Sequence, residues 1–119
     1  MRELNTVQTK EKLNTVYAVD EVGPGGANHL YKIKSKRYGD FDTLIQFQKG
    51  PRTMLTSVHG VLDVDLLEIV KDRLSSFQNG EYPSEYNEEA LKGINIALNA
   101  LNKRVEDRIS RNVLGKNEK

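Results

Sequence analysis

The fold of this chain is decided by residues 87–111, NEEALKGINIALNALNKRVEDRISR. Apolar residues in this stretch recur at intervals of three and four, which places them on one stripe of a long helix; they are Leu91, Ile94, Leu98, Leu101 and Val105. The next position of the stripe is Arg108, and Arg104 lies one turn before it. A guanidinium in an apolar stripe is costly unless a carboxylate or phosphate neutralises it. The sequence therefore predicts a functional role for this end of the helix.

A second helical pattern precedes this stretch, and a loop containing Pro83 separates the two. Its apolar residues again follow helical spacing; they are Leu66, Leu67, Val70, Leu74 and Phe77. We expect Asp63 or Asp65 to cap its start and Gly80 to follow its end, and Asn87 to cap the next helix. The sequence thus predicts an antiparallel helical hairpin over residues 63–111.

The first half of the chain has the alternating pattern of strands separated by turns. We expect strands at residues 15–22, 29–34 and 44–49, with a fourth candidate at residues 53–58. The run Gly23-Pro24-Gly25-Gly26 predicts one turn and residues 37–42 another. Residues 1–14 fit an edge strand, a frayed helix or a loose terminus, and residues 112–119 a tail. The prediction is a single α+β domain, 1–119, with an antiparallel β-meander at residues 15–60 followed by the hairpin.

Composition limits what this chain can do. With 119 residues, of which 37% are hydrophobic and none is tryptophan, the core is small and oligomerisation is a common remedy. The net charge of +1 gives no strong field toward nucleic acid polymers or membranes. The absence of cysteine excludes disulfides and thiolate chemistry. No apolar run approaches the roughly 20 residues of a membrane span, and the N-terminus lacks a signal-peptide core, so we expect an intracellular protein.

Catalytic patterns are weak. The two histidines, His29 and His59, are far apart in sequence, and no nucleophile, zinc or phosphate-loop motif occurs. We therefore expect no enzyme, no metal and no cofactor. For Arg111 we favour an ordinary role, either complementing the helix dipole or pairing with Glu106 or Asp107. Arg104 and Arg108 are better candidates, since a forked guanidinium suits a diphosphate and stacks on a base.

From Gly60 onward the chain resembles the phage Thoeris anti-defence proteins of the first family described. The most specific segments are LLEIVKDRLSSFQNG at residues 66–80, the helix start at Asn87, and LNKRVEDRISR at residues 101–111. GPGGANHLYKI at residues 23–33 and IQFQKGPR at residues 45–52 resemble the sheet region of that family. A related helical hairpin occurs in phage anti-CBASS sponges. The resemblance covers about residues 16–116.

The resemblance implies a non-enzymatic sponge. Such proteins hold a cyclic ADP-ribose isomer (glycocyclic ADP-ribose) made by TIR-domain immune proteins, in the cytoplasm of the infected bacterium. By resemblance, the ligand-binding residues here are Phe77, Asn87, Arg104 and Arg108. Phe77 would stack on adenine, Asn87 would bind base or ribose, and the two arginines would bind phosphates. Some members also bind cyclic trinucleotides, for which Arg52 is the candidate here. The loop at residues 82–86 and the segment at residues 111–116 depart from the family pattern, which bears on the choice of isomer.

Geometry alone also indicates more than one subunit at the ligand. Asn87 and Arg104 are 17 positions apart, roughly 25 Å along one helix. If both bind the same ligand of dinucleotide size, one of them must come from a neighbouring subunit, so we expect a homodimer with two shared pockets. The resemblance further implies a hexamer built as a trimer of dimers. Two other interpretations remain: a small phage nucleic-acid-binding protein, and a structural interaction module whose arginines form inter-subunit salt bridges.

Overall fold

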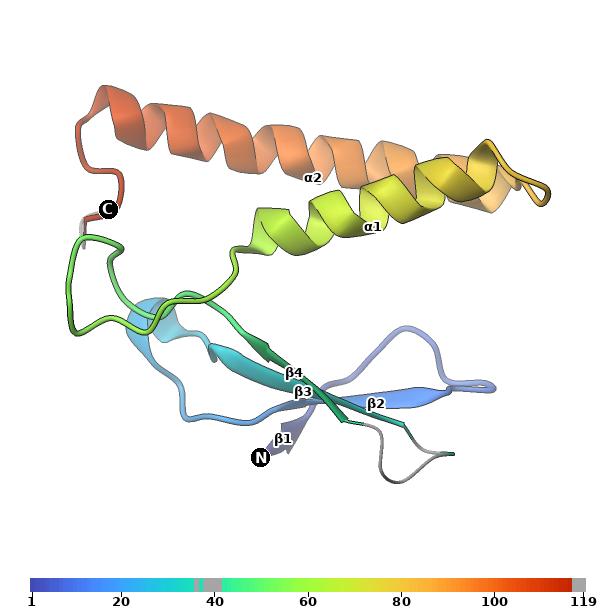
Figure 1. The fold of residues 1–119 in the computed structure, drawn as a ribbon, viewed down its shortest axis with the longest axis horizontal. Coiled ribbons are helices and arrows are strands. Elements are labelled where there is room, and N and C mark those ends of the chain that lie inside the picture. The colour runs from blue at the N-terminus through green and yellow to red at the C-terminus, as the bar shows by residue number, and fades with distance from the viewer. Residues whose placement is uncertain (36, 38–41, 117–119) are drawn as a thin grey trace. The chain divides into compact units, whose positions relative to one another are not determined.

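The computed structural model describes residues 1–35, 37 and 42–116. The chain forms two compact units, Met1–Val61 and Leu62–Lys119. The first is an antiparallel sheet and the second a pair of helices, so the α+β class and the order of its parts are confirmed (Figure 1). The prediction of a single domain stays a prediction. In the described part of the chain, no helix is long and apolar enough to cross a membrane.

The first unit is a four-stranded meander in the order β1-β2-β3-β4, with every neighbouring pair antiparallel. Its strands are β1 (Arg2–Glu3), β2 (Asn14–Ala18), β3 (Leu30–Ser35) and β4 (Asp42–Gln46). In the central pair Val16 lies opposite Ile33, and Tyr31 of β3 lies opposite Ile45 of β4. Within residues 1–14, only β1 is an edge strand; the rest of this segment up to β2 is irregular. The predicted turn at residues 37–42 lies mostly outside the described residues.

The core of this unit is thin. Among the described residues of the whole chain, Ala18 is the one hydrophobic side chain that is buried, at 1% exposure. Two polar side chains of the sheet, Thr15 and Ser35, are also buried. Tyr31 and Phe47 add an edge-to-face ring contact, with centroids 5.6 Å apart. Residues with high strand propensity therefore form the sheet but bury little side-chain area in the single chain.

The expected fourth strand at residues 53–58 is wrong. This segment is instead a closed loop, because Gly50 has a positive φ of 92° and Pro51 supplies no amide for a ladder. The amide of Met54 and the hydroxyl of Ser57 both bond to the Pro51 carbonyl, at 3.1 and 2.6 Å. Val58 pairs back to Lys49 through an isolated bridge. The strand predicted at residues 44–49 is correspondingly shorter and ends at Gln46.

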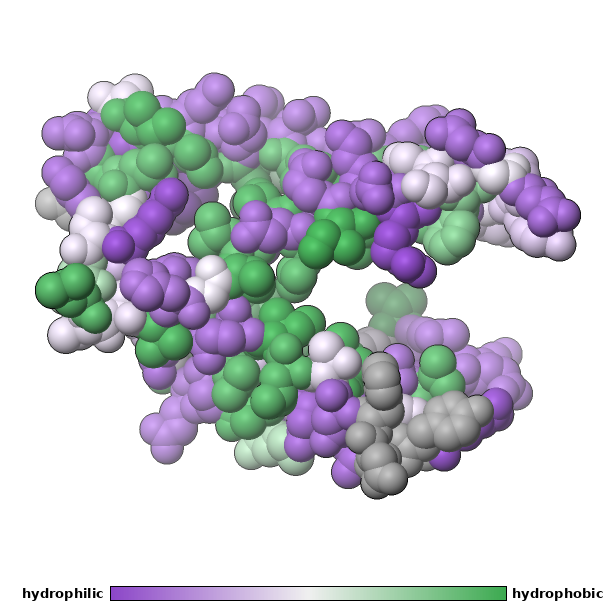
Figure 2. Space-filling model, viewed as in Figure 1, coloured by the Kyte–Doolittle hydropathy of each residue, from purple (hydrophilic) through white to green (hydrophobic). Residues whose placement is uncertain are grey.

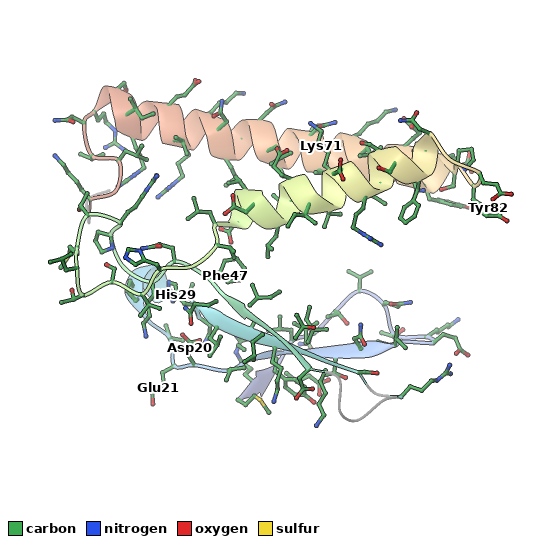
Figure 3. The ribbon with its side chains drawn as sticks, viewed as in Figure 1. Asp20, Glu21, His29, Phe47, Lys71 and Tyr82 are labelled. Atoms are coloured by element: carbon green, nitrogen blue, oxygen red, sulfur yellow. The ribbon has the colours of Figure 1, made fainter. Side chains whose placement is uncertain are left out.

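The turn between β2 and β3 is organised by Asp20, where the strand predicted at residues 15–22 has already ended (Figure 3). Its carboxylate accepts the backbone amides of His29 and Leu30 at 3.1 and 3.2 Å. Its carbonyl accepts Asn28 Nδ2 at 2.7 Å. The GPGG run at residues 23–26, between Asp20 and Asn28, contains a 3-10 turn at Pro24–Gly26, which confirms the predicted turn. The positive φ of Gly25, 76°, explains a glycine there.

Stability should depend on Asp20 at acid pH. Partial burial raises the pKa of the Asp20 carboxyl, but the hydrogen bonds from His29, Leu30 and Asn28 lower it by more, so the pKa lies below that of an ordinary aspartate. The charged form therefore stabilises the fold above pH 4, and this contribution is lost as pH falls through the lowered pKa. We expect Asp20→Asn to lower the unfolding temperature at pH 7 and to flatten its decline below pH 4. Calorimetry from pH 2.5 to 7 measures both, and an unchanged acid profile would contradict the assignment.

The second unit is a helical hairpin of α1 (Asp63–Gln78) and α2 (Glu85–Ser110). Both predicted N-caps are wrong by a few residues. The N-cap of α1 is Leu62, whose amide donates to the Asp65 carboxylate at 2.8 Å. The N-cap of α2 is Ser84, whose hydroxyl accepts the Asn87 amide at 3.1 Å. Ser84 and not Asn87 is the N-cap because the backbone at Pro83 and Ser84 is not helical and the helix begins directly after Ser84. Gly80 follows the C-cap Asn79, as predicted.

Candidate functional site

One half of the predicted ligand set lies at the loop end of the hairpin. Phe77 is on the last turn of α1 and 50% exposed, and Asn87 is on the first turn of α2 and half-buried. Gln78 closes the loop between them: its Nε2 donates to the Ser84 carbonyl at 2.9 Å and to Glu88 Oε1 at 2.8 Å. Its Oε1 accepts the Ser84 amide at 2.8 Å. These bonds fix the ends of both helices, and so hold Phe77 and Asn87 at one place in the fold.

The other half lies at the far end of α2. Because α2 is continuous from Glu85 to Ser110, Asn87 and Arg104 are held roughly 25 Å apart along its axis. Arg104 is exposed and Arg108 is 7% exposed. The single chain therefore places the predicted residues at two ends of the hairpin, Phe77 and Asn87 at the loop end and Arg104 and Arg108 at the far end of α2.

Arg108 is the most buried charged side chain in the described part of the chain. Its Nη2 donates to the carbonyls of Val113 and Lys116, at 3.0 and 2.9 Å. The segment after α2 returns over the guanidinium because Asn112 and Gly115 adopt positive φ values of 57° and 75°. Both hydrogens of Nη2 are then used, while Nε and Nη1 bond to none of the residues that the structure describes. The buried charge thus meets backbone dipoles instead of a carboxylate.

Arg111 pairs with Asp107, one of the two ordinary roles that the sequence analysis favoured for it. Its Nη2 lies 3.0 Å from Asp107 Oδ2 across one helical turn, with side chains 47% and 61% exposed. Such exposed pairs contribute little stability. Of the three arginines at this end of α2, Arg104 alone is exposed without a recorded ion pair or hydrogen bond in the described part of the chain.

The burial of Arg108 predicts that its removal loosens the end of the hairpin. We expect Arg108→Ala to lower the free energy of unfolding by about 1–3 kcal/mol, because two hydrogen bonds from a charged group are lost. Amide hydrogen exchange at Val113 and Lys116 should accelerate. The matched variant Arg111→Ala should change stability by about 0.5 kcal/mol or less, since its pair with Asp107 is exposed. Equal losses in the two variants would contradict this role of Arg108.

Phe77 has a neighbour that the sequence analysis missed. The guanidinium carbon of Arg73 lies 5.4 Å from the centroid of the Phe77 ring. The signal was present, since the two residues are four apart on one helix and so lie on the same face. The contact covers one face of a half-exposed ring with a cation. A flat ligand that stacks on Phe77 would use the other face or displace Arg73.

Each helix of the hairpin also leaves one face unpartnered. On α1, Val70 and Phe77 are 44% and 50% exposed although both belong to the apolar pattern, while Leu67 and Leu74 are half-buried. With about 100° of rotation per residue, Leu66, Val70 and Phe77 share one side of α1. On α2 a row of small residues lies on the same side as Arg104; it consists of Ala90, Gly93, Ala97 and Ala100. A Cβ on Gly93 would meet no atom within 4 Å.

The remaining candidates stand apart from these residues. Arg52 is exposed on the loop of the first unit, and no described contact joins it to another predicted site residue. His59 is exposed, and the buried Nδ1 of His29 has no hydrogen-bond partner among the described residues (Figure 3). Within the described residues, no group of three or more His, Asp or Glu side chains could hold a metal ion.

Comparison with known proteins gives the family. A family model described as "Acb2/Tad1, hairpin domain" matches residues 42–106, more than half of the chain. The match includes Phe77, Asn87 and Arg104 and ends just before Arg108. "Thoeris anti-defense 1" of Bacillus phage SBSphiJ7 is 36% identical over 95 residues, 80% of this chain. The aligned region spans 66% of that relative, slightly less than two thirds of its length. The chain therefore belongs to the Acb2/Tad1 hairpin family and is a homologue of Thoeris anti-defense 1.

Proposed function

We propose that this protein is a Thoeris anti-defence sponge: it binds a cyclic ADP-ribose isomer made by TIR-domain immune proteins and withholds it, uncleaved, in the cytoplasm of the infected bacterium. Family membership supports the anti-defence role. The proposed ligand is glycocyclic ADP-ribose. Phe77 stacks on adenine, Asn87 binds base or ribose, and Arg104 and Arg108 bind the diphosphate. Slow release follows from charge-assisted bonds inside a pocket that excludes water.

The observation that carries the proposal is the separation of the two residue pairs along α2. A two-fold axis across α2 would set Asn87 of one subunit against Arg104 of the other, with its centre between positions 95 and 96. The small residues Ala90, Gly93, Ala97 and Ala100 are centred on position 95. They permit two antiparallel helices to approach closely at the point where the axis must pass. One dimer would then hold two equal pockets, each completed by the partner subunit.

The exposed surface also supports association. The chain exposes 9298 Å². Two separate compact bodies that together have its mass of 13.5 kDa would expose roughly 7,900 Å². The excess is more than the approximately 800 Å² that one subunit buries in a standard interface. Figure 2 shows that apolar residues contribute to the surface of the chain. A hexamer, and a cyclic trinucleotide site that uses Arg52, are further parts of this proposal.

The other two interpretations are less well supported. Salt bridges to carboxylates would favour a structural module, but Arg104 and Arg108 form none in the described part of the chain. A nucleic-acid-binding role needs several free cations on one face. Here Arg108 is buried and Arg111 pairs with Asp107, which leaves Arg104. Tight, steeply salt-dependent binding to duplex DNA in a filter-binding titration would reverse this preference.

The decisive experiment identifies the captured molecule. Purified protein is incubated with lysate that contains the TIR-made messenger, washed, heated, and the released compound analysed by mass spectrometry. We expect one intact cyclic ADP-ribose isomer, in an amount close to one per pocket. Release of a hydrolysed product would show that the protein is an enzyme. Release of no such nucleotide would refute the proposed sponge function.

A further inference from the structure

The hairpin carries a groove, lined by both polar and apolar side chains, on the side of α1 and α2 away from Phe77. Its volume is about 380 Å³, within the range of small-molecule sites. Its lining comes from both helices and consists of Val64, Glu68, Lys71, Asn95, Leu98, Asn99, Asn102 and Val105. On α1 the lining positions are 64, 68 and 71, and on α2 the polar ones are 95, 99 and 102. Each set has the i, i+4, i+7 spacing of one helical face.

Lys71 is the unusual member of this lining. It is half-buried at a position where the spacing of Leu67 and Leu74 predicts a seam residue between the two helices (Figure 3). A cation at such a position is costly unless an anion or several hydrogen-bond acceptors face it. In the part of the chain that the structure describes, Lys71 has neither an ion pair nor a hydrogen bond. Its charge therefore remains available to a ligand.

The polar side chains around Lys71 are exposed and make few bonds within the chain. Among described residues Asn95 and Asn99 make no recorded side-chain bond, and Asn102 makes one long contact of 3.4 Å to Glu106. Because the antiparallel helices are joined by the Gln78–Glu88 bond, Lys71 lies roughly level with Asn95 and Glu68 with Asn99. Carboxamides offer two donors and an acceptor each. Along the helix axes the groove thus has two levels. One holds the ammonium of Lys71 and the amide of Asn95, and the next holds the carboxylate of Glu68 and the amide of Asn99.

We propose that this groove is a binding site for the phosphate ester of a small sugar, separate from the messenger pockets. Lys71 and Asn95 bind the phosphate, since an ammonium and amide N–H groups complement its oxygens. Glu68 accepts hydrogen bonds from sugar hydroxyls, assisted by Asn99 and Asn102. Lys71 and Glu68 are three residues apart, about 4.5 Å along the axis, which suits a phosphate and hydroxyls on one pentose.

This site does not depend on the proposed dimer. The small-residue row and Arg104 lie on the other side of α2 from Asn95, Asn99 and Asn102, by about 100° or more of helical rotation for most of them. A partner subunit that covers the small-residue row would leave the groove open. Binding here can therefore be tested whether or not the messenger pocket exists.

The test is a titration with ribose 5-phosphate, inorganic phosphate and ribose, followed by NMR of the asparagine side-chain amides. We expect ribose 5-phosphate to shift the amide signals of Asn95, Asn99 and Asn102, and ribose alone to leave them unchanged. Lys71→Met should weaken binding by about 10-fold or more, because a charged hydrogen bond is lost while the apolar stem is kept. The matched control Lys34→Met removes an exposed lysine of β3 that does not line the groove and should bind like the parent.

A second variant distinguishes loss of a ligand contact from loss of folding, because it should change the affinities for two ligands in opposite directions. Glu68→Gln should strengthen binding of inorganic phosphate and reduce the preference for ribose 5-phosphate, because it removes the charge that repels phosphate and leaves one neutral, weaker acceptor for the hydroxyls. Arg104→Ala should leave groove binding unchanged even where it abolishes messenger capture. Unshifted groove amides, equal affinity of Lys71→Met and parent, or shifts confined to residues near Arg104 would overturn the proposal.

Discussion

Arg104→Ala should weaken capture of the proposed cyclic ADP-ribose ligand by about 30-fold or more and leave the fold and the proposed dimer unchanged. Truncating one member of a buried charge pair across an interface typically costs about 2–5 kcal/mol. In the single chain Arg104 is exposed and bonds to none of the described residues, so its removal should not change the stability of the protomer. Its whole effect should therefore fall on the bound state. This contrasts with Arg108, whose removal also loosens the segment at residues 112–116.

The measurement is isothermal titration with purified messenger, combined with light scattering to report the subunit number. Lys103→Ala is the matched control: it removes one positive charge from the neighbouring position, which faces another side of α2. We expect Lys103→Ala to bind within about two-fold of the parent, as exposed charges act weakly at this range. Parent-like affinity in Arg104→Ala would place the diphosphate elsewhere and remove the main support for the shared pocket.

Gly93→Leu should dissociate the dimer and abolish capture at both pockets together. Gly93 lies within the small-residue row near the proposed axis, and its missing Cβ faces open space in the single chain. Leucine there would therefore be tolerated by the protomer but would hold two α2 helices apart. It should even stabilise the isolated helix, by up to about 1 kcal/mol, since glycine is a poor helix former. Loss of the dimer could then not be attributed to unfolding.

Sedimentation analysis across a concentration series, with circular dichroism, separates these outcomes. Lys92→Leu adds a similar apolar side chain at the adjacent position, on a side of α2 away from the small-residue row, and should remain dimeric. A Gly93→Leu protein that is still dimeric and still binds messenger would show that the two-fold contact uses another surface. A dimeric protein that fails to bind would separate assembly from the pocket.

The helices were predictable because their information is local. Spacings of three and four residues place apolar side chains on one stripe, and α1 and α2 follow those stripes within a few residues of the predicted bounds. The caps were less predictable. Asn87 and Ser84 are both good N-cap residues, and only the backbone conformation chooses Ser84. The wrong prediction of a strand at residues 53–58 has a similar origin. These residues have high strand propensity, but the backbone turn at Gly50 and Pro51 makes the segment a loop.

The candidate site divides in the same way. The sequence by itself determined the order of sheet and hairpin, the arginines that interrupt the stripe of α2, and the distance along α2 from which we propose a pocket shared by two subunits. Tertiary structure alone decided that Arg108 is buried against the carbonyls of Val113 and Lys116 while Arg104 stays exposed. It alone placed Lys71 in a groove between α1 and α2, whereas the contact of Arg73 with Phe77 follows from their spacing of four residues on one helix. The reason is physical: periodicity along a helix is fixed by neighbouring residues, but the partner of a charge depends on which distant segments the chain folds beside it.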